Sequence, residues 1–547
     1  MGKTCFSRRE FIAAAGMGAA ALTLNPPRLS ARAAEIGPRE KYPVVVIGAG
    51  RGGLTAAAYL ARAGFPVTVV EQHSVPGGYA TAFDRAGGEF RFEVSLHGTA
   101  INNNTPAKIL EELGILEHLE LVPLPDTYRI KTAKGDIVVP QGNPQAFIQQ
   151  LSQRFPEEAA GISGFVGEML AIHDETETYG RKGETFKRWT KVFFPLLYPR
   201  MWKVRRQTLA DLLADHVTDP EVRSALAFLW GYYGLPPEKL SAFYYAIATA
   251  GYLKNGSFYI KDRSQRLSDL LAETIAAAGG ELIYDTAAEK ILIEDQAVSG
   301  VVLSDGRTLP ARAVVSNASA PSLFNQMLPR GSLPGAYLEK LRRYRPSISC
   351  FIVWLGIDRS LRGALPGYSS RVEMGQSPEE SYAMALRGDI GNMPYNLCLY
   401  DNLYEGYSAP GTATLQIFTL SGYAPWRRFE ADYRGGEKTA YAAEKKRWAD
   451  TLIRRAEADL LPGLTRMIAV REAATPLTNW RFTGNTEGAI YGYEQSMQNA
   501  FMNRIDNQTP IKGLYLAGAW GEPGGGFTGV LRSGRRTFEQ MMAAWGA

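Results

Sequence analysis

The sequence predicts an α/β fold that opens with a strand, a helix and a second strand, and three stretches indicate this order. The stretch "PVVVIGAG" is a β-rich apolar run that ends in closely spaced glycines. The stretch "LTAAAYLARAG" follows with the small residues of a helix that packs tightly on a sheet. A second apolar run, "FPVTVVEQ", is typical of a strand and ends at Glu71.

The glycines between the first strand and the helix have the spacing G-x-G-x-x-G, at Gly48, Gly50 and Gly53. Gly48 allows the tight turn, Gly50 lets the backbone approach a pyrophosphate, and Gly53 lets helix and strand touch. Glu71 lies 21 positions after Gly50, where a carboxylate takes a ribose diol. The unit therefore predicts a Rossmann-type dinucleotide site. Because Glu71 would repel a 2′-phosphate, the site favours FAD or NAD over NADP.

The same glycine spacing recurs near the C-terminus, at Gly524, Gly526 and Gly529. A second site would need another helix, another strand and an acid about 20 residues further on, and only one helix fits before Ala547. We therefore expect the strand "LYLAG" and the helix that begins near Gly526 to return to the first domain and present a positive helix end to the same ligand. A glycine-rich turn without a ligand is the alternative.

The stretch "VPGGYATAFDRAGGEFRFEVSLHGTA", with Gly77, Gly78 and His97, resembles the flavin-dependent amine oxidase superfamily, especially its branch of phytoene desaturases, carotenoid isomerases and retinol saturases. Blocks at 257–330 and 475–545 are similar to the same branch. The resemblance implies a glutathione-reductase-like FAD-binding domain with a discontinuous α+β substrate or cap domain. It implies FAD contacts from the glycine turns and their neighbours: Gly48, Gly50, Gly53, Glu71, Gly77, Gly78, Ala288, Gly518, Gly526, Phe527 and Thr528.

The expected division of the chain is interleaved. The FAD-binding domain is predicted to draw on residues 41–105, 258–330 and 470–547. The substrate or cap region is predicted to draw on residues 106–257 and 331–469.

Residues 1–33 look like a twin-arginine export signal. Arg8 and Arg9 precede Phe11 and Ile12, a mildly apolar stretch too short to span a bilayer follows, and "ARA" is a small-residue cleavage site. Because this route carries folded proteins, we expect a periplasmic protein that receives its cofactor in the cytoplasm. A disordered basic tail is the alternative.

Composition and charge narrow the classes of function. Of 547 residues, 45% are hydrophobic and 21% charged, which suits two or three cores. The formal charge of +5 falls to +1 without residues 1–33, which hold five of the 60 positive and one of the 55 negative residues, so nucleic acid is not an expected partner. The five histidines show no pair at metal-ligand spacing, so no metal site is indicated. Cys350 and Cys398 are interpreted as buried thiols rather than a disulfide.

Four polar residues in or beside the family-like blocks are candidates for the chemistry: His97, Arg481, Tyr491 and Glu494. His97 would donate a hydrogen bond near the flavin or serve only as a structural hydrogen-bonder. Glu494 with Tyr491 would give or take a proton, or else be an exposed acid beside a packed tyrosine.

The chain departs from the family pattern in three places. Ser95 stands where relatives usually have glycine, and Lys261 and Asp262 stand where they often have a Gly-Gly turn. Ala519 replaces a frequent polar residue. The first two changes concern the shape of the flavin and substrate side, and the third removes a ribityl contact.

Residues 186–206, "FKRWTKVFFPLLYPRMWKVRR", interleave basic and aromatic side chains, a pattern typical of a segment at a membrane surface. Pro195 and Pro199 argue against one long helix. Contact with a membrane surface and a lid over the substrate site both remain open, and either implies an apolar ligand nearby.

Together these features predict a periplasmic FAD-dependent oxidoreductase. Its expected substrate is apolar and unsaturated, carotenoid-, retinoid- or lipid-like, and is changed by desaturation, saturation or isomerisation of C–C bonds. Hydride equivalents would move between an allylic carbon and the flavin, with a quinone or other diffusible redox partner, since no nicotinamide domain is encoded. A flavin amine oxidase and a non-catalytic flavoprotein that binds a lipid or protein partner are the alternatives.

Overall fold

The computed structural model describes residues 41–132, 135–182, 186, 190–373, 375–500 and 503–546. Tyr42–Gln540 belong to one unit, and the fold and site below are those of this unit. Among the described residues, the other unit contains only Lys41 and the end of the C-terminal helix from Met541. The predicted export signal at 1–33 lies outside the described residues.

A five-stranded parallel sheet carries the predicted strand–helix–strand unit. All four residues of its central strand are buried, as expected for a parallel strand covered on both faces. Its strands, in spatial order, are β19 (Leu514–Leu516), β13 (Ala313–Ser316), β1 (Val44–Ile47), β2 (Val67–Val70) and β9 (Glu281–Ile283). Stretches of chain far apart in sequence thus meet in one sheet. The helices associated with it are α2 (Arg51–Arg62), α13 (Arg263–Ala277) and α21 (Phe527–Trp545).

Three small antiparallel sheets accompany the parallel sheet in the described residues, and the third of them pairs β5 (Leu121–Pro123) with β8 (Phe258–Ile260). A hairpin over "SDGRT" connects the last two strands of the first of these small sheets. These strands are β10 (Ala288–Glu294), β11 (Ala297–Leu303) and β12 (Thr308–Pro310), and the second sheet pairs β3 (Ala82–Arg85) with β4 (Phe90–Glu93).

A seven-stranded mixed sheet forms the second layer of the unit. Its one parallel pair is β15 with β6, and its other pairs are antiparallel. Its strands, in spatial order, are β18 (Ile468–Ala474), β14 (Ser349–Ile357), β17 (Ala413–Ser421), β16 (Tyr395–Leu399), β15 (Ser369–Val372), β6 (Tyr128–Thr132) and β7 (Gly135–Val139). Both parts of the predicted cap region contribute to this sheet, but the domain boundaries themselves stay a prediction.

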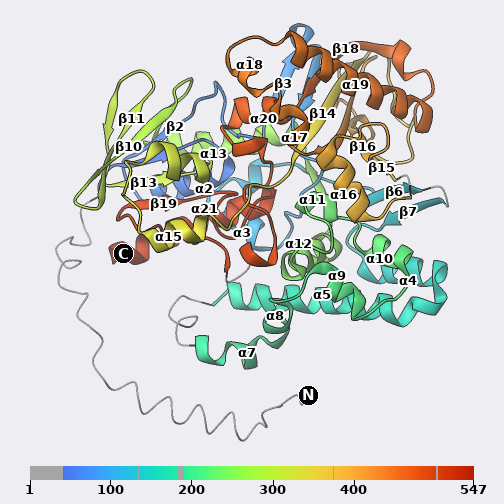
Figure 1. Cartoon of the computed structure of the whole chain (residues 1–547), viewed down its shortest axis with the longest axis horizontal. Helices are drawn as coiled ribbons and strands as arrows, with labels where there is room; N and C mark the ends of the chain where they lie inside the picture. Colours follow the sequence, from blue (N-terminus) through green and yellow to red (C-terminus); the bar gives the residue numbers. More distant parts are fainter. Residues whose placement is uncertain are drawn as a thin grey trace, which may run out of the picture. The chain divides into compact units, whose positions relative to one another are not determined.

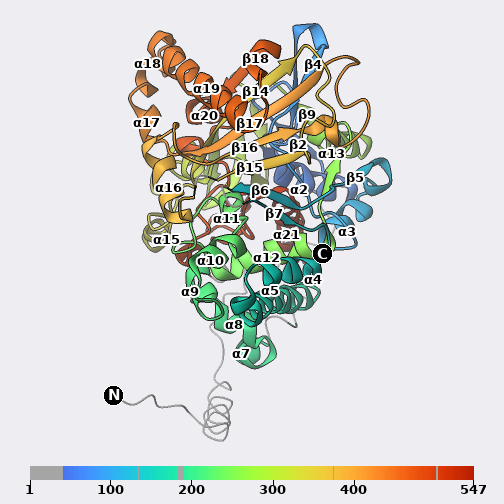
Figure 2. The same cartoon turned by 90° about the vertical axis from the view of Figure 1, so that its right-hand side faces the viewer.

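Helices form a layer below the seven-stranded sheet in both Figure 1 and Figure 2. Phe165 of α5 and Ala246 of α12 share a core with Phe351 and Val353 of β14. Helix α12 begins where the Ser241 hydroxyl accepts from the amide of Tyr244. The layer comprises α4 (Pro144–Arg154), α5 (Ala159–Gly180), α7 (Phe194–Leu197), α8 (Pro199–Val204), α9 (Leu209–Ala214), α10 (Pro220–Leu226), α11 (Trp230–Tyr233) and α12 (Ala242–Asn255).

The remaining helices lie outside this layer. They are α3 (Thr105–Glu112), α14 (Ala320–Ser322), α15 (Gly335–Leu341), α16 (Pro378–Arg387), α17 (Ala424–Arg427), α18 (Glu430–Arg434), α19 (Thr439–Asp459) and α20 (Pro476–Thr483). No helix in the described ranges is long and apolar enough to cross a membrane.

Candidate active site and cofactor site

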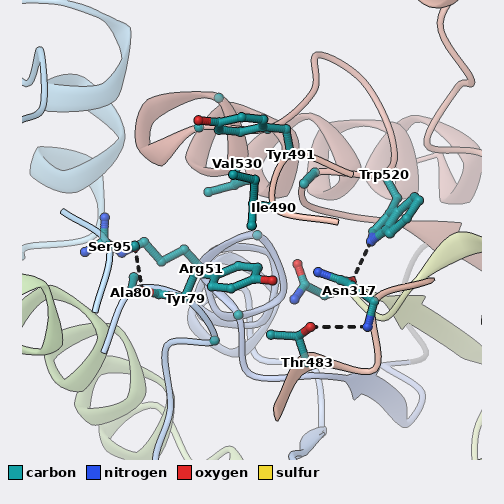
Figure 3. Close-up of a pocket in the computed structure, with 18 of the residues that line it drawn as sticks. Arg51, Tyr79, Ala80, Ser95, Asn317, Thr483, Ile490, Tyr491, Trp520 and Val530 are labelled. Atoms are coloured by element: carbon teal, nitrogen blue, oxygen red, sulfur yellow. Dashed lines mark hydrogen bonds between the residues drawn. The ribbon is translucent and has the colours of Figure 1, made fainter. Parts of the chain in front are cut away.

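A cavity of about 970 Å³ extends from the parallel sheet to the helical layer. Both glycine turns line one part of it, and aromatic side chains from α11, α12 and β17 line another. In Figure 3 the side chains of Arg51, Tyr79, Asn317 and Trp520 lie around the same space, with Tyr491 beyond them.

The first glycine turn joins β1 to α2 as the sequence predicts. Gly48 has a φ of +90°, which favours glycine, and no side chain caps the N-terminus of α2 at Gly50. A Cβ on Gly53 would lie 2.3 Å from the carbonyl oxygen of Gly48. Gly48 and Gly50 line the cavity, whereas Gly53 does not and instead permits the close contact of helix and strand.

Glu71 lines the cavity directly after β2. Its Oε2 accepts a hydrogen bond from the amide of Ala49 at 2.6 Å, and its Oε1 accepts from the amide of His73 at 2.9 Å. Burial raises the pKa of this carboxyl, and the backbone donors counteract that effect. The carboxyl is therefore held against the glycine turn, where a ribose is expected.

Arg51 is the first residue of α2, and its guanidinium is buried beside the cavity. Its Nη2 donates to the carbonyl oxygen of Ser264 at 3.0 Å, and the group lies 4.1 Å from the ring centroid of Phe527. Its Nε and Nη1 have no hydrogen-bond partner. Burial lowers the pKa of Arg51 to about 9, so the group remains charged at neutral pH. A buried cation with free donors beside an uncapped helix N-terminus fits a pyrophosphate.

The second glycine turn, between β19 and α21, reaches the same cavity. Gly526 has a φ of +93°, and a Cβ there would meet no atom within 4 Å. Gly526, Phe527 and Thr528 line the cavity, as do Gly77, Gly78 and Ala288 from the earlier segments. Gly518 does not line it.

Gly518 instead packs against the first glycine turn. A Cβ on Gly52 would lie 2.4 Å from the Cα of Gly518, so the two turns touch backbone to backbone. Between them, the Asn317 Oδ1 accepts from the amide of Gly53 at 3.2 Å. The two glycine motifs therefore border one dinucleotide site.

The aromatic part of the cavity is formed mainly by tyrosines. The Tyr244 hydroxyl donates to the carbonyl oxygen of Gly525 at 3.0 Å, and the Tyr491 hydroxyl donates to that of Gly231 at 3.3 Å. Burial raises the pKa of Tyr244 to about 12 and that of Tyr491 further, so both phenols are neutral. The aromatic side chains that line the cavity here are Tyr232, Tyr233, Tyr244, Tyr252, Trp354, Phe418 and Tyr491.

The four candidate catalytic residues are not brought together. His97 and Tyr491 line the aromatic part of the cavity. Arg481 lines the cavity as well, but its neighbour Phe482 contacts Gln72 and His73, which places Arg481 at the Glu71 end.

Glu494 does not line the cavity. Its charged neighbours are Arg345 and Lys239, and burial raises its pKa. Glu494 is therefore not placed to act with Tyr491 in proton transfer to or from a ligand in the cavity. The physical reason is that Tyr491 and Glu494 lie in an irregular segment whose side chains face different ways.

The departures from the family pattern have different locations. Ser95 and Ala519 line the cavity, and the Ser95 hydroxyl donates to the carbonyl oxygen of Tyr79 at 2.6 Å. Asp262 is outside it and has a φ of +63°, followed by Arg263 with a φ of +75°. A Gly-Gly turn would relieve this strain, whereas here the Arg263 guanidinium is anchored on the carbonyl oxygen of Arg91 at 2.7 Å.

Cys350 and Cys398 are free and buried. In the part of the chain that the structure describes, no group of three His, Cys, Asp or Glu side chains is placed to hold a metal ion.

The sequence pattern described as "Flavin containing amine oxidoreductase" matches residues 52–542. The chain belongs to this family. A prolycopene isomerase of Daucus carota is 26% identical over 91% of this chain and 80% of its own length. An all-trans-retinol 13,14-reductase of Macaca fascicularis is 27% identical over 88% and 82%, and a lycopene-forming phytoene desaturase of Pseudescherichia vulneris is 24% identical over 91% and 98%.

Solved structures confirm the predicted fold class. An oxidoreductase from Methanosarcina mazei aligns with a TM-score of 0.58 at 17% identity, over 91% of this chain and all of the other. Wild-type putrescine oxidase bound to putrescine aligns with a TM-score of 0.59 at 16% identity, over 92% and 99%. The predictions of a flavin-dependent oxidoreductase and of FAD as its cofactor are confirmed by the family.

Arg51 and Asn317 border the cofactor site but are not among the residues predicted from the sequence. A charged residue inside a G-x-G-x-x-G turn was a readable signal for Arg51, because an arginine there is placed beside the phosphates. Asn317 has no such local signal, because its side-chain amide meets the two turns through tertiary contacts alone.

Proposed function

We propose that this flavoenzyme acts on an apolar, unsaturated, polyene-like substrate by desaturation, saturation or isomerisation of C–C bonds. The observation that carries the proposal is the tyrosine-rich part of the cavity, which continues directly from the glycine turns. The names of the prolycopene isomerase, the retinol reductase and the phytoene desaturase reported above support the same substrate class.

FAD, when bound, supplies hydride transfer to or from carbon. Arg51, Glu71 and the two glycine turns would hold it. The neutral phenols of Tyr244 and Tyr491 are tied to backbone carbonyls, so they keep the cavity wall in place and offer ring faces to a polyene.

The pairing of a carboxylate in the cavity wall with an arginine favours a neutral substrate over an amine. Glu177 of α5 lines the cavity near α12, but its Oε1 accepts from Nη2 of Arg532 at 2.7 Å. Among the described residues around the aromatic part of the cavity, an ammonium group would find no unpaired carboxylate. Aromatic faces do attract cations, so an amine remains the alternative substrate that an experiment must exclude.

The test is turnover of FAD-loaded protein in detergent without oxygen. Phytoene with a benzoquinone, prolycopene with chemically reduced enzyme, and all-trans-retinol with chemically reduced enzyme are each followed by product chromatography. We expect one polyene to be converted. Hydrogen peroxide from putrescine in air, with no polyene converted, would favour an amine oxidase, and no reaction with any probe would favour a non-catalytic flavoprotein.

We also propose that the segment around α7 and α8 contacts a membrane surface. Val192 and Leu196 are 69% and 67% exposed, and Phe193 and Leu197 are exposed beside them. Both Figure 1 and Figure 2 place α7 at the outer end of the helical layer. Arg200 and other cations nearby suit an anionic lipid surface.

The remaining parts of the proposal concern location and redox partner. We propose twin-arginine export to the periplasm and a quinone or similar diffusible carrier as electron partner. Replacing Arg8 and Arg9 by lysine should retain the protein in the cytoplasm, as cell fractionation would measure. Reoxidation of reduced enzyme by a soluble quinone, faster than by oxygen, would support the carrier.

A further inference from the structure

His97 is held in the wall of the aromatic part of the cavity. Its imidazole ring stacks on Phe418 with ring centroids 4.6 Å apart, and it lies 6.1 Å from the ring of Tyr232 at a similar tilt. All three side chains line the cavity. These contacts fix the plane of the imidazole, so its two ring nitrogens point in fixed directions.

The Nδ1 atom of His97 lies beside two side chains that do not line the cavity. The Tyr400 hydroxyl lies 3.1 Å from Nδ1, and the Cys398 thiol lies 3.3 Å from it. The thiol has another acceptor in the Ser369 hydroxyl, at 3.4 Å. Nδ1 therefore meets one strong partner, Tyr400.

Tyr400 has one hydroxyl hydrogen, and besides His97 and the Cys398 thiol its hydroxyl has two close neighbours, both oxygens. The carbonyl oxygen of Leu96 and the Oε1 of Gln416 each lie 2.9 Å from the phenol oxygen. The Gln416 amide orientation is fixed, because its Nε2 donates to the carbonyl oxygen of Val94 at 2.9 Å. Both neighbours can only accept.

This geometry decides where the imidazole carries its hydrogen. If Tyr400 donated to His97, both oxygens at 2.9 Å would face the phenol oxygen with no hydrogen between them. If Tyr400 donates to one of those oxygens, its own oxygen is free to accept, and Nδ1–H of His97 supplies the hydrogen. Burial also lowers the pKa of His97 to about 4, so the neutral ring has no second hydrogen at neutral pH.

We propose that His97 presents an unprotonated Nε2 to the cavity and accepts a hydrogen bond from an alcohol group of the substrate. The proposal rests on the proposed function and narrows its substrate class to unsaturated alcohols. It differs from the expectation that His97 donates. An aldehyde or an ether would place a lone pair against that of Nε2, so the site should discriminate against both.

The first experiment determines the tautomer. The protein is labelled with ¹⁵N-histidine, and the His97 signals are assigned by their absence in His97→Phe. We expect a protonated Nδ1 and an unprotonated Nε2 in FAD-loaded wild type. A protonated Nε2 would overturn the proposal, whatever the enzyme turns over.

The second experiment measures binding, without turnover, by quenching of tryptophan fluorescence. The probes are all-trans-retinol, retinal and retinyl methyl ether. In wild type we expect the alcohol to bind roughly tenfold tighter than the other two. In His97→Phe, or in His97→Gln if the first variant does not fold, this ratio should fall to about one.

Two tyrosine variants separate the tautomer from general packing. Tyr400→Phe removes the acceptor of Nδ1–H, so the alcohol preference should shrink. Tyr407→Phe is the matched control, because its ring stacks on Tyr400 at 5.4 Å but its hydroxyl contacts Tyr259 rather than His97. It should keep the wild-type preference.

Equal binding of the three probes by wild type, a preference for retinal, or no binding of retinol would each overturn the proposal. These outcomes are distinguishable from failure of the proposed function. If the proposed function is wrong, the alcohol preference and the expected tautomer are observed but no product forms. If the His97 proposal is wrong, the alcohol preference is absent while polyene turnover persists.

Discussion

Gly53 is the position in the first glycine turn where one added methyl group should have a large effect. In Gly53→Ala the Cβ would lie 2.3 Å from the carbonyl oxygen of Gly48 and 3.0 Å from the Cβ of Asn317. Non-bonded heavy atoms prefer roughly 3.5 Å, so α2 must move away from β1 by about 1 Å. We expect a loss of about 1–3 kcal/mol of stability from this overpacking.

The same displacement moves the N-terminus of α2, and binding sites tolerate only about 0.5 Å. FAD affinity should therefore fall roughly tenfold or more. Thermal melting with and without FAD, and titration of FAD fluorescence, measure the two effects. Gly167→Ala is the control: its Cβ meets nothing within 4 Å inside α5, and it should stabilise the protein by about 0.5–1 kcal/mol. A Gly53→Ala protein with the melting temperature and FAD affinity of wild type would refute this reasoning.

Three further predictions concern charge, protonation and the exposed apolar surface. Arg51→Gln removes a buried cation with free hydrogen-bond donors, so it should lower FAD affinity by roughly 10- to 100-fold without lowering the melting temperature of the apoprotein. Unchanged FAD affinity in calorimetry would exclude Arg51 from the cofactor site. As pH falls from 6.5 to 4, His97 is protonated in the unfolded state before it is protonated in the folded state, because burial lowers its pKa in the folded protein. In urea titrations wild type should therefore lose up to about 3 kcal/mol more stability over this range than His97→Phe does. Equal losses in the two proteins would contradict the lowered pKa. Leu196→Glu should weaken the sedimentation of the protein with anionic phospholipid vesicles. Leu386→Glu, at an exposed leucine of α16, is the control and should not weaken it. Equal vesicle binding by both variants would count against a membrane role for α7.

The first half of the cofactor site was predictable because its determinants are local. A buried strand, a glycine turn and a helix of small residues fix the path of the chain over about 20 residues, and Glu71 ends the next strand. The same local pattern of strand, glycines and helix predicted the start of α21 near Gly526.

The catalytic candidates were less predictable because side-chain direction depends on tertiary contacts. Arg481 and Tyr491 come from one family-like block, yet Glu487 between them has a φ of +56°, and the chain turns there. Arg481 consequently lies at the Glu71 end, and Tyr491 lies in the aromatic cluster. No periodic pattern in an irregular segment predicts such a change of direction.

Glycines near the two ends of the chain allow two stretches of backbone to approach closely. Gly52 and Gly518 touch across the turns, and a Cβ on Gly534 of α21 would lie 2.5 Å from the carbonyl oxygen of Gly52. Helices α2 and α21 are therefore in contact through glycines, with Asn317 bonded to the first turn beside them. None of these three is one of the spaced glycines of the two G-x-G-x-x-G motifs, and within the second motif a Cβ on Gly526 would meet no atom within 4 Å. The close approach of the two turns therefore depends on Gly52, Gly518 and Gly534, whereas Gly526 borders the cavity itself.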